Sequence, residues 1–346
     1  MKTVENVKPL VSVLIAAYNQ ENYIAQTLDS VLMQECPFDY EILIGEDCSD
    51  DRTRDICLEY ARNHPDKIRL ILNKQNKGLI NNYFDILEQA RGEYLADCGG
   101  DDYWLTTDKL NRQVALLMQY PEVSLVYGNW QMLHQKSGLL ETNRIERSED
   151  WFDPECFGSE AVKDYLNKQK VPMVVLSTAC FRADWLNEAI QSKRNLFRSG
   201  NVVCEDLPIT LCLLLKGPFY LMKEELMIYR VLEKSVSHSE TIDDNLKGFS
   251  FKVFMQTLEL TLGLGLSLNK IKPYVHSALP NFIFFAFITN DKEWMNLVVR
   301  TVKGYGIKLN LKQLIMYICT QNKVTSWLVL HIYRLIKGKR KNTWTA

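Results

Sequence analysis

Short apolar runs alternate with amphipathic segments along the first hundred residues. The runs are rich in β-branched and aliphatic side chains, as is typical of strands buried on both faces of a parallel sheet. They span residues 11–17, 41–45, 68–72 and 94–96. Helices are expected between them, at residues 21–33, 53–63 and 79–90. This alternation predicts βαβ units and a parallel sheet with helices on both faces.

The hydrophobic pattern is less regular after Trp130. The expected elements are a polar irregular segment, an apolar run, a helix and two edge strands, at residues 134–170, 171–181, 207–216, 220–222 and 226–231. From residue 245 onward the pattern becomes helical. We therefore expect a sheet domain at residues 1–240 and a helical C-terminal region at residues 241–346.

No segment resembles a membrane span, which needs about 20 predominantly apolar residues. Residues 273–290 are uncharged, but Pro280 and two polar side chains interrupt them, so a buried helix is expected. The C-terminus joins an apolar segment, 326–336, to the basic cluster 337–341. This pattern fits a helix lying on an anionic membrane surface, and it fits a packed terminal helix with a solvated tail equally well.

Composition narrows the class of protein. The chain has 346 residues and a formal net charge of −1, whereas nucleic-acid-binding proteins usually carry a strong basic excess. Nine cysteines are scattered without a C-x-x-C pair, and the N-terminus lacks the apolar core of a signal peptide. We therefore expect reduced thiols, a cytoplasmic location and no nucleic-acid partner.

Acidic segments follow the second and fourth predicted strands, at Glu46–Asp51 (EDCSDD) and Gly99–Trp104 (GGDDYW). Open α/β sheets bind ligands at the carboxyl ends of their strands. The chain has neither G-x-G-x-x-G nor G-x-x-x-x-G-K-[ST], so a glycine-cradled phosphate site is unsupported. Adjacent carboxylates such as Asp101 and Asp102 repel each other unless a cation lies between them, and Mg²⁺ or Mn²⁺ prefers such oxygen ligands.

Simpler structural roles are also open for these carboxylates. Asp101 and Asp102 can end a strand and cap the helix that starts near Asp108. Asp47 and Ser49 are expected to cap the next helix in addition to any ligand role of Asp47, and Asp206 can be the N-cap of the helix that follows it.

Four ordered motifs carry a family resemblance: VSVLIAAYN at 11–19, EDCSDD at 46–51, the segment 92–104, and Glu205-Asp206. Together they resemble the signature of family 2 glycosyltransferases over roughly residues 8–240. The resemblance implies an α/β GT-A fold, meaning a Rossmann-like, mainly parallel sheet flanked by helices, here with a helical C-terminal extension.

The resemblance also implies a set of site residues. They are Ala17, Tyr18, Asp47, Asn76, Gly78, Asn82, Gly100, Asp101 and Glu205 for a nucleotide sugar, Asp101, Asp102 and His238 for a metal, and Asp206 as the catalytic base. The chain departs from the family's D-x-D motif because Gly99 replaces the first acidic residue, which implies a weaker ion site. Trp104 is interpreted as a packing residue, and Arg230 is expected to pair with diphosphate oxygens or to stabilise a local carboxylate.

The implied activity is metal-dependent, inverting sugar transfer from a nucleotide-diphospho-sugar, most commonly a UDP-sugar in this family. The acceptor would be a glycan or a lipid-linked glycan of a surface polysaccharide, with Mn²⁺ or Mg²⁺ as cofactor. Residues 134–170 would form an acceptor-side loop or a surface insertion. The C-terminal region would contact the inner face of the membrane peripherally or form a homodimer. The alternative, favoured by Gly99, is a catalytically impaired homologue that binds glycans or acts as a partner subunit.

Overall fold

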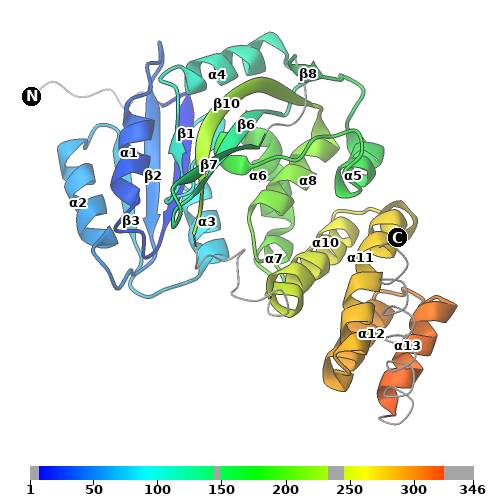
Figure 1. Ribbon diagram of the computed structural model, residues 1–346. Coiled ribbons are helices and arrows are strands. Elements are labelled where there is room, and N and C mark those ends of the chain that lie inside the picture. The colour runs from blue at the N-terminus through cyan, green and yellow to red at the C-terminus, as the bar shows by residue number, and fades with distance from the viewer. Residues whose placement is uncertain (1–7, 144–148, 233–244, 323–346) are drawn as a thin grey trace, which may run out of the picture.

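The computed structural model describes residues 8–143, 149–232 and 245–322. Its described strands form one sheet with helices on both faces, and further helices extend away from the sheet toward the C-terminus (Figure 1). This arrangement confirms the predicted α/β class with a helical C-terminal extension.

The first four strands are parallel and have the order β3-β2-β1-β4. They are β1 (Val11–Ala17), β2 (Tyr40–Glu46), β3 (Ile68–Leu72) and β4 (Tyr94–Asp97). Three helices connect them: α1 (Ile24–Leu32), α2 (Thr53–Asn63) and α3 (Leu79–Leu87). All of these elements were predicted, because long apolar runs and helical spacing are strong local signals. Parallel pairing brings the polar loops that follow β1, β2 and β4 to one edge of the sheet.

The second half of the sheet is mixed. Its order continues from β4 through β9 and β6 to β10 and β5, with β9 antiparallel to both of its neighbours and β10 parallel to β6. The bounds are β5 (Tyr103–Trp104), β6 (Leu125–His134), β7 (Leu139–Asn143), β8 (Trp151–Phe152), β9 (Cys180–Arg182) and β10 (Phe219–Val231). Strand β7 pairs with β6, and β8 pairs with β10.

Two predictions for this half were wrong. The two expected edge strands are a single strand, β10, inside the sheet. Its charged middle is accommodated by register shifts between Met222 and Met227, so its pairing with β6 continues on both sides of them. The segment 134–170 contains β7, β8 and helix α5 (Gly158–Leu166). The sequence did not predict these strands because they are short. Leu139 and Leu140 on β7 are both exposed, so β7 lacks the alternation of buried and exposed residues that indicates a strand.

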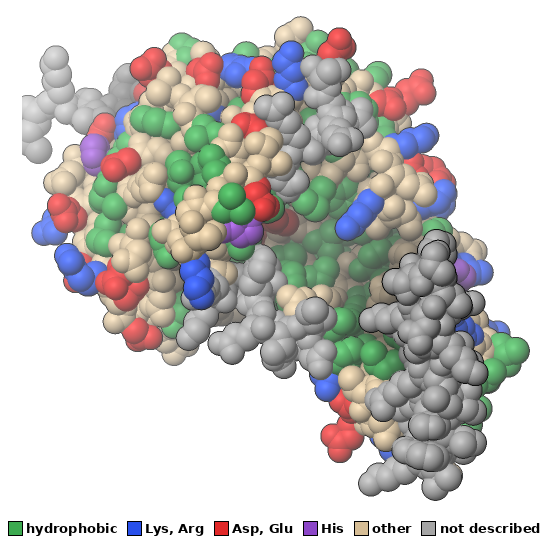
Figure 2. Space-filling view, viewed as in Figure 1, with side chains coloured by type: hydrophobic (Ala, Val, Ile, Leu, Met, Phe, Trp, Pro, Cys, Tyr) green, Lys and Arg blue, Asp and Glu red, His purple; other side chains and the backbone are tan. Residues whose placement is uncertain are grey.

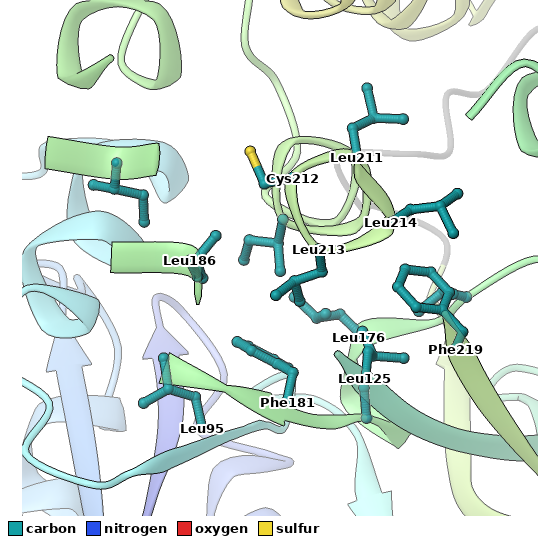
Figure 3. Close-up of a cluster of buried hydrophobic side chains, with 14 of the residues drawn as sticks. Leu95, Leu125, Leu176, Phe181, Leu186, Leu211, Cys212, Leu213, Leu214 and Phe219 are labelled. Carbon is teal, nitrogen blue, oxygen red and sulfur yellow. The ribbon is translucent and has the colours of Figure 1, made fainter. Parts of the chain in front are cut away.

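Each face of the sheet has its own hydrophobic core. Alternate residues of β1 show this, since Leu14 packs on one side while Val13 and Ile15 pack on the other. Helices α1, α2 and α4 (Lys109–Gln119) cover the second side. Helices α3, α6 (Ala183–Ser192) and α8 (Asp206–Lys216) contribute to the core on the first side. Figure 3 shows α8 over this core, with Leu213 above Leu176 and Phe181.

The C-terminal helices build a third core around Phe254, Phe282 and Val298. They are α10 (Phe251–Gly263), α11 (Leu268–Ile288), α12 (Lys292–Gly304) and α13 (Leu311–Gln321), and a π-helical turn, Leu246–Ser250, precedes them. Apolar side chains gather on the face of the molecule between the sheet and these helices (Figure 2). Most of the uncharged stretch 273–290 lies in α11 and is helical and largely buried, as predicted.

Helix α10 also packs against the sheet domain. Its Leu260 is buried in the same hydrophobic core as the apolar side chains of α8. Leu196 of the short helix α7 (Arg194–Phe197) lies against Gly263 of α10. The predicted boundary at residue 240 falls outside the described residues and stays a prediction. None of the helices in the described ranges is sufficiently long and apolar to cross a membrane.

Gly92 allows the chain to enter β4 in close contact with β1. A Cβ atom at this position would lie 2.5 Å from the backbone nitrogen of Ser12 and 2.7 Å from the carbonyl oxygen of Tyr94. Backbone atoms cannot move aside cheaply, so we expect Gly92→Ala to lower the free energy of unfolding by about 3 kcal/mol. Urea unfolding with an unchanged m value would measure this loss.

The matched control is Gly200→Ala, because no atom lies within 4 Å of a Cβ built at Gly200. We expect this variant to stay within about 0.5 kcal/mol of the parent protein. Equal urea midpoints for the two variants would contradict the close approach at Gly92.

Candidate functional site

The loops after β1 and β2 are joined by hydrogen bonds at the carboxyl edge of the sheet. The Asp47 backbone N–H donates to the Ala17 carbonyl at 3.0 Å, and the Asn19 N–H donates to Ser49 Oγ at 3.0 Å. Ala17 is buried, whereas Tyr18 beside it is 41% exposed. The structure therefore brings together the three residues predicted to line a nucleoside pocket, with the Tyr18 ring on the surface.

The buried carboxylate of Asp47 organises the loop between β3 and α3. Its Oδ1 accepts hydrogen bonds from Asn73 Nδ2 and from the Lys77 backbone N–H, both at 2.9 Å. Its Oδ2 accepts from the Gly78 N–H, also at 2.9 Å. A carboxylate offers about four acceptor positions, so one remains for a ligand.

The expectation that Asp47 and Ser49 cap the following helix was wrong. Asp51 accepts the hydrogen bond of the Thr53 N–H at 2.9 Å at the start of α2, while Ser49 accepts from the β1 loop. Asp47 points toward the loop that follows the neighbouring strand β3, out of reach of the amides of α2.

The predicted residues of the β3–α3 loop form one network. Asn76 Oδ1 accepts from the Gly78 N–H at 2.8 Å, and Gly78 has a φ of 81°, a left-handed conformation that favours glycine. Asn82 is buried: its Nδ2 donates to the Gly45 carbonyl at 2.7 Å, and its Oδ1 accepts from Asn73. Asn82 therefore acts on the site indirectly, by tying α3 to β2 and to this loop.

Acidic side chains converge at the next part of the edge. Asp97 ends β4, one residue beyond the predicted strand, and was not singled out from the sequence because it lies next to an apolar run. Glu205 and Asp206, at the start of α8, lie close enough for their charges to act on it. Burial, followed by these mutual repulsions, raises the pKa of Asp97 to about 7, of Glu205 to about 8 and of Asp206 to about 7.

Asp101 and Asp102 differ in their surroundings. The buried Asp102 carboxylate accepts from the Arg230 backbone N–H at 3.1 Å and from Ser177 Oγ at 3.2 Å. Among the described residues, no other side chain hydrogen-bonds to the Asp101 carboxylate. Burial raises the pKa of both groups, and the Arg230 charge opposes this rise at Asp101. Asp102 is thus fixed by the fold, while Asp101 is free to bind a ligand.

The alternative that this pair caps a helix was wrong. Helix α4 begins at Lys109, after Asp108, and no side chain caps its first turn. The two carboxylates instead remain at the sheet edge, because β5 directly follows them and pairs with β10.

Gly99 and Gly100, the two glycines before this pair, lie against different neighbours. A Cβ at Gly99 would lie 2.9 Å from Asp102 Oδ2 and 3.4 Å from Asp101 Oδ1. The position that is acidic in the resembled motif therefore lies directly beside both carboxylates. A Cβ at Gly100 would lie 2.9 Å from the Ala16 carbonyl oxygen, so packing alone accounts for glycine there.

Arg230 holds the acidic loop by its backbone. Its buried guanidinium donates to the Asp101 carbonyl and, at 2.5 Å, to Gln26 Oε1, and it lies over the rings of Tyr23 and Tyr103. It forms no ion pair with a carboxylate of the described chain, but its positive charge favours the ionised form of Asp101 and its backbone N–H donates to Asp102. The expectation that Arg230 stabilises a local carboxylate is therefore confirmed, and its pairing with diphosphate oxygens stays a prediction.

Ser177 was not anticipated from the sequence. Its hydroxyl accepts from the Gly99 N–H at 3.0 Å, and its carbonyl accepts from Trp104 Nε1 at 2.9 Å. Trp104 is fully buried, which confirms its interpretation as a packing residue. No local pattern could reveal Ser177, because its partners lie more than seventy residues earlier in the chain.

Glu205 and Asp206 lie at the N-terminus of α8, where Glu205 is the N-cap residue and Asp206 the first helical residue. Neither side chain caps the helix, so the expectation that Asp206 does so was wrong. Glu205 Oε2 is buried and has no hydrogen-bond partner in the described chain. A buried carboxylate oxygen without a partner is costly, which is consistent with a ligand that completes the site.

Gln256 of α10 holds the backbone in front of these two carboxylates. Its Oε1 accepts from the Val203 N–H at 3.0 Å, and its Nε2 donates to the Cys204 carbonyl at 2.7 Å. Gln256 is completely buried. The sequence carries no signal for this role, because a glutamine on a helix is usually exposed.

The described side chains at this edge could bind a divalent cation only if a substrate supplied further oxygen ligands. Within the described ranges, no three His, Cys, Asp or Glu side chains are arranged to hold a metal. Mg²⁺ usually binds one or two carboxylates together with substrate phosphates, and Asp101 and the unpartnered Glu205 oxygen are suitable donors. His238, the third predicted metal ligand, lies outside the described residues.

Solved structures share this fold at low sequence identity. A *Staphylococcus aureus* TarS structure in complex with UDP-GlcNAc matches with a TM-score of 0.53 and 16% identity over 90% of each chain. A mannosyltransferase from *Pyrobaculum calidifontis*, in complex with GDP-Man and Mn²⁺, matches with a TM-score of 0.50 and 15% identity over 98% of this chain and 88% of that one.

Curated relatives match over shorter stretches. The putative teichuronic acid biosynthesis glycosyltransferase TuaG of *Bacillus subtilis* is 40% identical over 33% of this chain and 44% of its own length. WfgD of *Escherichia coli*, named as a UDP-Glc:alpha-D-GlcNAc-diphosphoundecaprenol beta-1,3-glucosyltransferase, is 31% identical over 37% of this chain and 48% of its own. The chain thus spans less than half the length of these relatives.

The family comparison covers more of the chain. Residues 12–189 match the model of "Glycosyl transferase family 2". The matched segment contains the loops after β1, β2 and β4 that form the acidic edge. Since it also takes in more than half of the chain, the chain belongs to glycosyl transferase family 2.

Proposed function

We propose that this chain is a glycosyltransferase that moves a sugar from a nucleotide-diphospho-sugar to a glycan or lipid-linked acceptor during polysaccharide synthesis. The observation that carries the proposal is the convergence of carboxyl groups, Asp97, Asp101, Glu205 and Asp206, at one edge of the sheet, where Glu205 Oε2 has no hydrogen-bond partner within the described residues. The raised pKa values of Asp97, Glu205 and Asp206 agree with this arrangement. Membership of the family supports the reaction class. A UDP-sugar donor is supported by the UDP-Glc in the name of WfgD and by the UDP-GlcNAc bound in the TarS structure.

The nucleoside would bind at the joined loops after β1 and β2. The exposed Tyr18 ring offers an apolar face, and Asp47 retains one acceptor position for a donor group of the base. The Asp47 carboxylate is held by three hydrogen bonds, so its orientation is set before the ligand arrives. Asn76 and Gly78 shape the border of this pocket from the β3–α3 loop.

Asp206 would act as the general base. It accepts the proton of the acceptor hydroxyl while that oxygen forms its bond to the anomeric carbon, and the bond from the anomeric carbon to the diphosphate breaks on the opposite face. The anomeric configuration is therefore inverted. A pKa of about 7 suits this role, because a base works best with a pKa near the operating pH.

Asp101 and Asp102 would hold Mn²⁺ or Mg²⁺, with His238 as a further ligand. The ion, when bound, neutralises negative charge on the departing diphosphate. Asp102 contributes mainly by keeping the loop in place through Ser177 and the Arg230 backbone, so Asp101 is the principal ligand. A glycan-binding partner subunit without activity is less well supported, because only Gly99 favours it.

The acceptor and location remain parts of the same proposal. A lipid-linked acceptor is supported by the diphosphoundecaprenol substrate in the name of WfgD. We propose a cytoplasmic protein with peripheral contact to the inner membrane face through its C-terminal region; homodimer formation stays a prediction.

Replacing the proposed base tests the reaction directly. We expect Asp206→Asn to lower kcat by about 10²–10⁴-fold, since an amide cannot accept the proton. The KM for the donor should stay close to that of the parent protein, and the melting temperature should not fall, because burial already disfavours the charged form of Asp206. Transfer from a UDP-sugar panel to a lipid-linked acceptor measures the loss, and NMR of the product reports the anomeric configuration.

The matched control is Asp184→Asn, which makes the same change in the first turn of α6 at an exposed position. This variant should retain full activity. Wild-type kcat in Asp206→Asn would remove the base assignment, and a product of retained configuration would remove the inverting mechanism.

The metal assignment makes a separate prediction. We expect Asp101→Asn to raise the Mn²⁺ concentration needed for half-maximal transfer by about tenfold or more, which corresponds to about 1.4 kcal/mol. Asp102→Ala should in addition lower the melting temperature, because it removes the side-chain oxygens that accept the Ser177 and Arg230 hydrogen bonds and hold the loop. An unchanged Mn²⁺ requirement in Asp101→Asn would contradict this ligand role.

The raised pKa of Glu205 makes stability depend on pH in the metal-free protein. Between its ordinary pKa of 4.5 and about 8, the folded state keeps a proton that the unfolded chain has released. Stability therefore falls as the pH rises through this window. We expect Glu205→Gln to melt a few degrees above the parent at pH 8 and at nearly the same temperature at pH 4.5.

Glu122→Gln is the control, because Glu122 is exposed. Its melting temperature should follow that of the parent at every pH. Thermal melts without divalent cations measure both variants, and a difference for Glu205→Gln that is constant with pH would refute the effect.

A further inference from the structure

A row of exposed apolar side chains runs along one face of α13. Leu311 is 73% exposed, Ile318 57% and Ile315 50%, and Leu314 is also exposed. Their spacing of three, four and seven residues places them on the same side of a helix. We call these four residues the α13 apolar face.

This face is not part of the protein core. The inward side of α13 carries Gln313 and Thr320, which are buried, and the C-terminal core contacts the helix through Met316 and Tyr317. Gln313 also closes the helix start through a reciprocal pair of hydrogen bonds with Asn310. The orientation of the helix is therefore well determined, and its apolar face is directed outward. Contiguous exposed apolar surface of this kind marks an interaction site.

The charge around the face indicates an anionic partner. All 42 acidic side chains of the chain lie at or before Glu293, whereas residues 294–346 contain ten lysines and arginines. Lys303, Lys308 and Lys312 are exposed, and none forms an ion pair with a described residue. By contrast, Lys247 at the beginning of the helical region is paired with Asp291 at 2.6 Å.

The position of the face suits a planar surface. Helices α12 and α13 lie at the end of the molecule farthest from β1, β2 and β3 (Figure 1). The chain continues beyond α13 with the apolar segment 326–336 and the basic cluster 337–341, so the same chemistry extends further along the sequence. A nucleic acid would leave the apolar side chains in water. A second copy would bring two strongly cationic ends together, which like-charge repulsion opposes.

We propose that the α13 apolar face docks on an anionic lipid bilayer. Its leucine and isoleucine side chains enter the boundary between headgroups and acyl chains, while Lys308 and Lys312 contact lipid phosphates. This proposal rests on the proposed function in one respect: it would place the enzyme on the surface that carries a lipid-linked acceptor.

Vesicle flotation of the full-length protein tests the proposal without any sugar nucleotide. We expect binding to vesicles of phosphatidylcholine and phosphatidylglycerol, little binding to phosphatidylcholine alone, and weaker binding in high salt. Ile315→Gln combined with Ile318→Gln should reduce the bound fraction about tenfold or more. The control combines Met118→Gln with Met173→Gln, which removes two equally exposed apolar side chains outside α13 and should leave binding unchanged.

Circular dichroism shows whether the Ile315→Gln, Ile318→Gln variant is folded. If it is not, a second variant tests the same proposal. Lys308→Gln combined with Lys312→Gln should weaken binding to anionic vesicles severalfold without affecting the core. Three results would overturn the proposal: no flotation of the parent protein, wild-type flotation of the folded variants, or a parent dimer that only the α13 variants dissociate. The assay needs no turnover, so its failure and a failure of the transferase proposal are distinguishable.

Discussion

Burial of several neighbouring carboxyl groups, together with the repulsion between them, is the constraint on which the site depends. Asp97, Asp101, Asp102, Glu205 and Asp206 share one edge of the sheet, and within the described residues the charges of Lys109 and Arg230 act on them. Lys109 is completely buried, hydrogen-bonded to Gln113 Oε1 at 2.9 Å, and burial lowers its pKa to about 8. The loop that carries the central pair must therefore be held by neutral donors and backbone groups. Thr27 Oγ1 donates to the Asp102 carbonyl at 2.6 Å, and Ser177 and Arg230 supply the remaining bonds.

The C-terminal helices take part in this arrangement. Gln256 of α10 holds the backbone before Glu205 by hydrogen bonds, and Lys193 Nζ donates to the Gly263 carbonyl at the end of the same helix at 2.7 Å. The first helix after the sheet domain thus supports the side of the site where an acceptor hydroxyl would meet Asp206. The last helix of the described residues, α13, lies farther from the sheet. One helical region therefore connects the reaction site with the proposed contact surface.

The local hydrophobic pattern predicted the parallel half of the sheet. The strand pairing of the other half and the hydrogen bonds of the site depend on contacts between residues that are distant in the sequence. The charged middle of β10 divided one strand into two predicted ones, and only pairing with β6 joins them. Asp47 was placed correctly beside Ala17, but its carboxylate contacts the β3–α3 loop instead of the α2 amides. The motifs pointed to Asp101 and Asp206, which the structure brings to the same edge of the sheet, whereas Ser177 and Gln256 belong to no motif.

The strands of the parallel half, the helices between them and the acidic segments at the strand ends follow from the amino-acid sequence alone, because they depend on side-chain periodicity over a few residues. The cationic character of the C-terminal part is equally readable from the sequence. The three-dimensional fold was needed to learn which carboxylates meet, which of the described ones lacks a partner, and which face of α13 is exposed. Those properties depend on contacts between residues that are far apart in the chain, such as Gly99 with Ser177 and Cys204 with Gln256. Desolvation and repulsion act only after folding has brought such groups together.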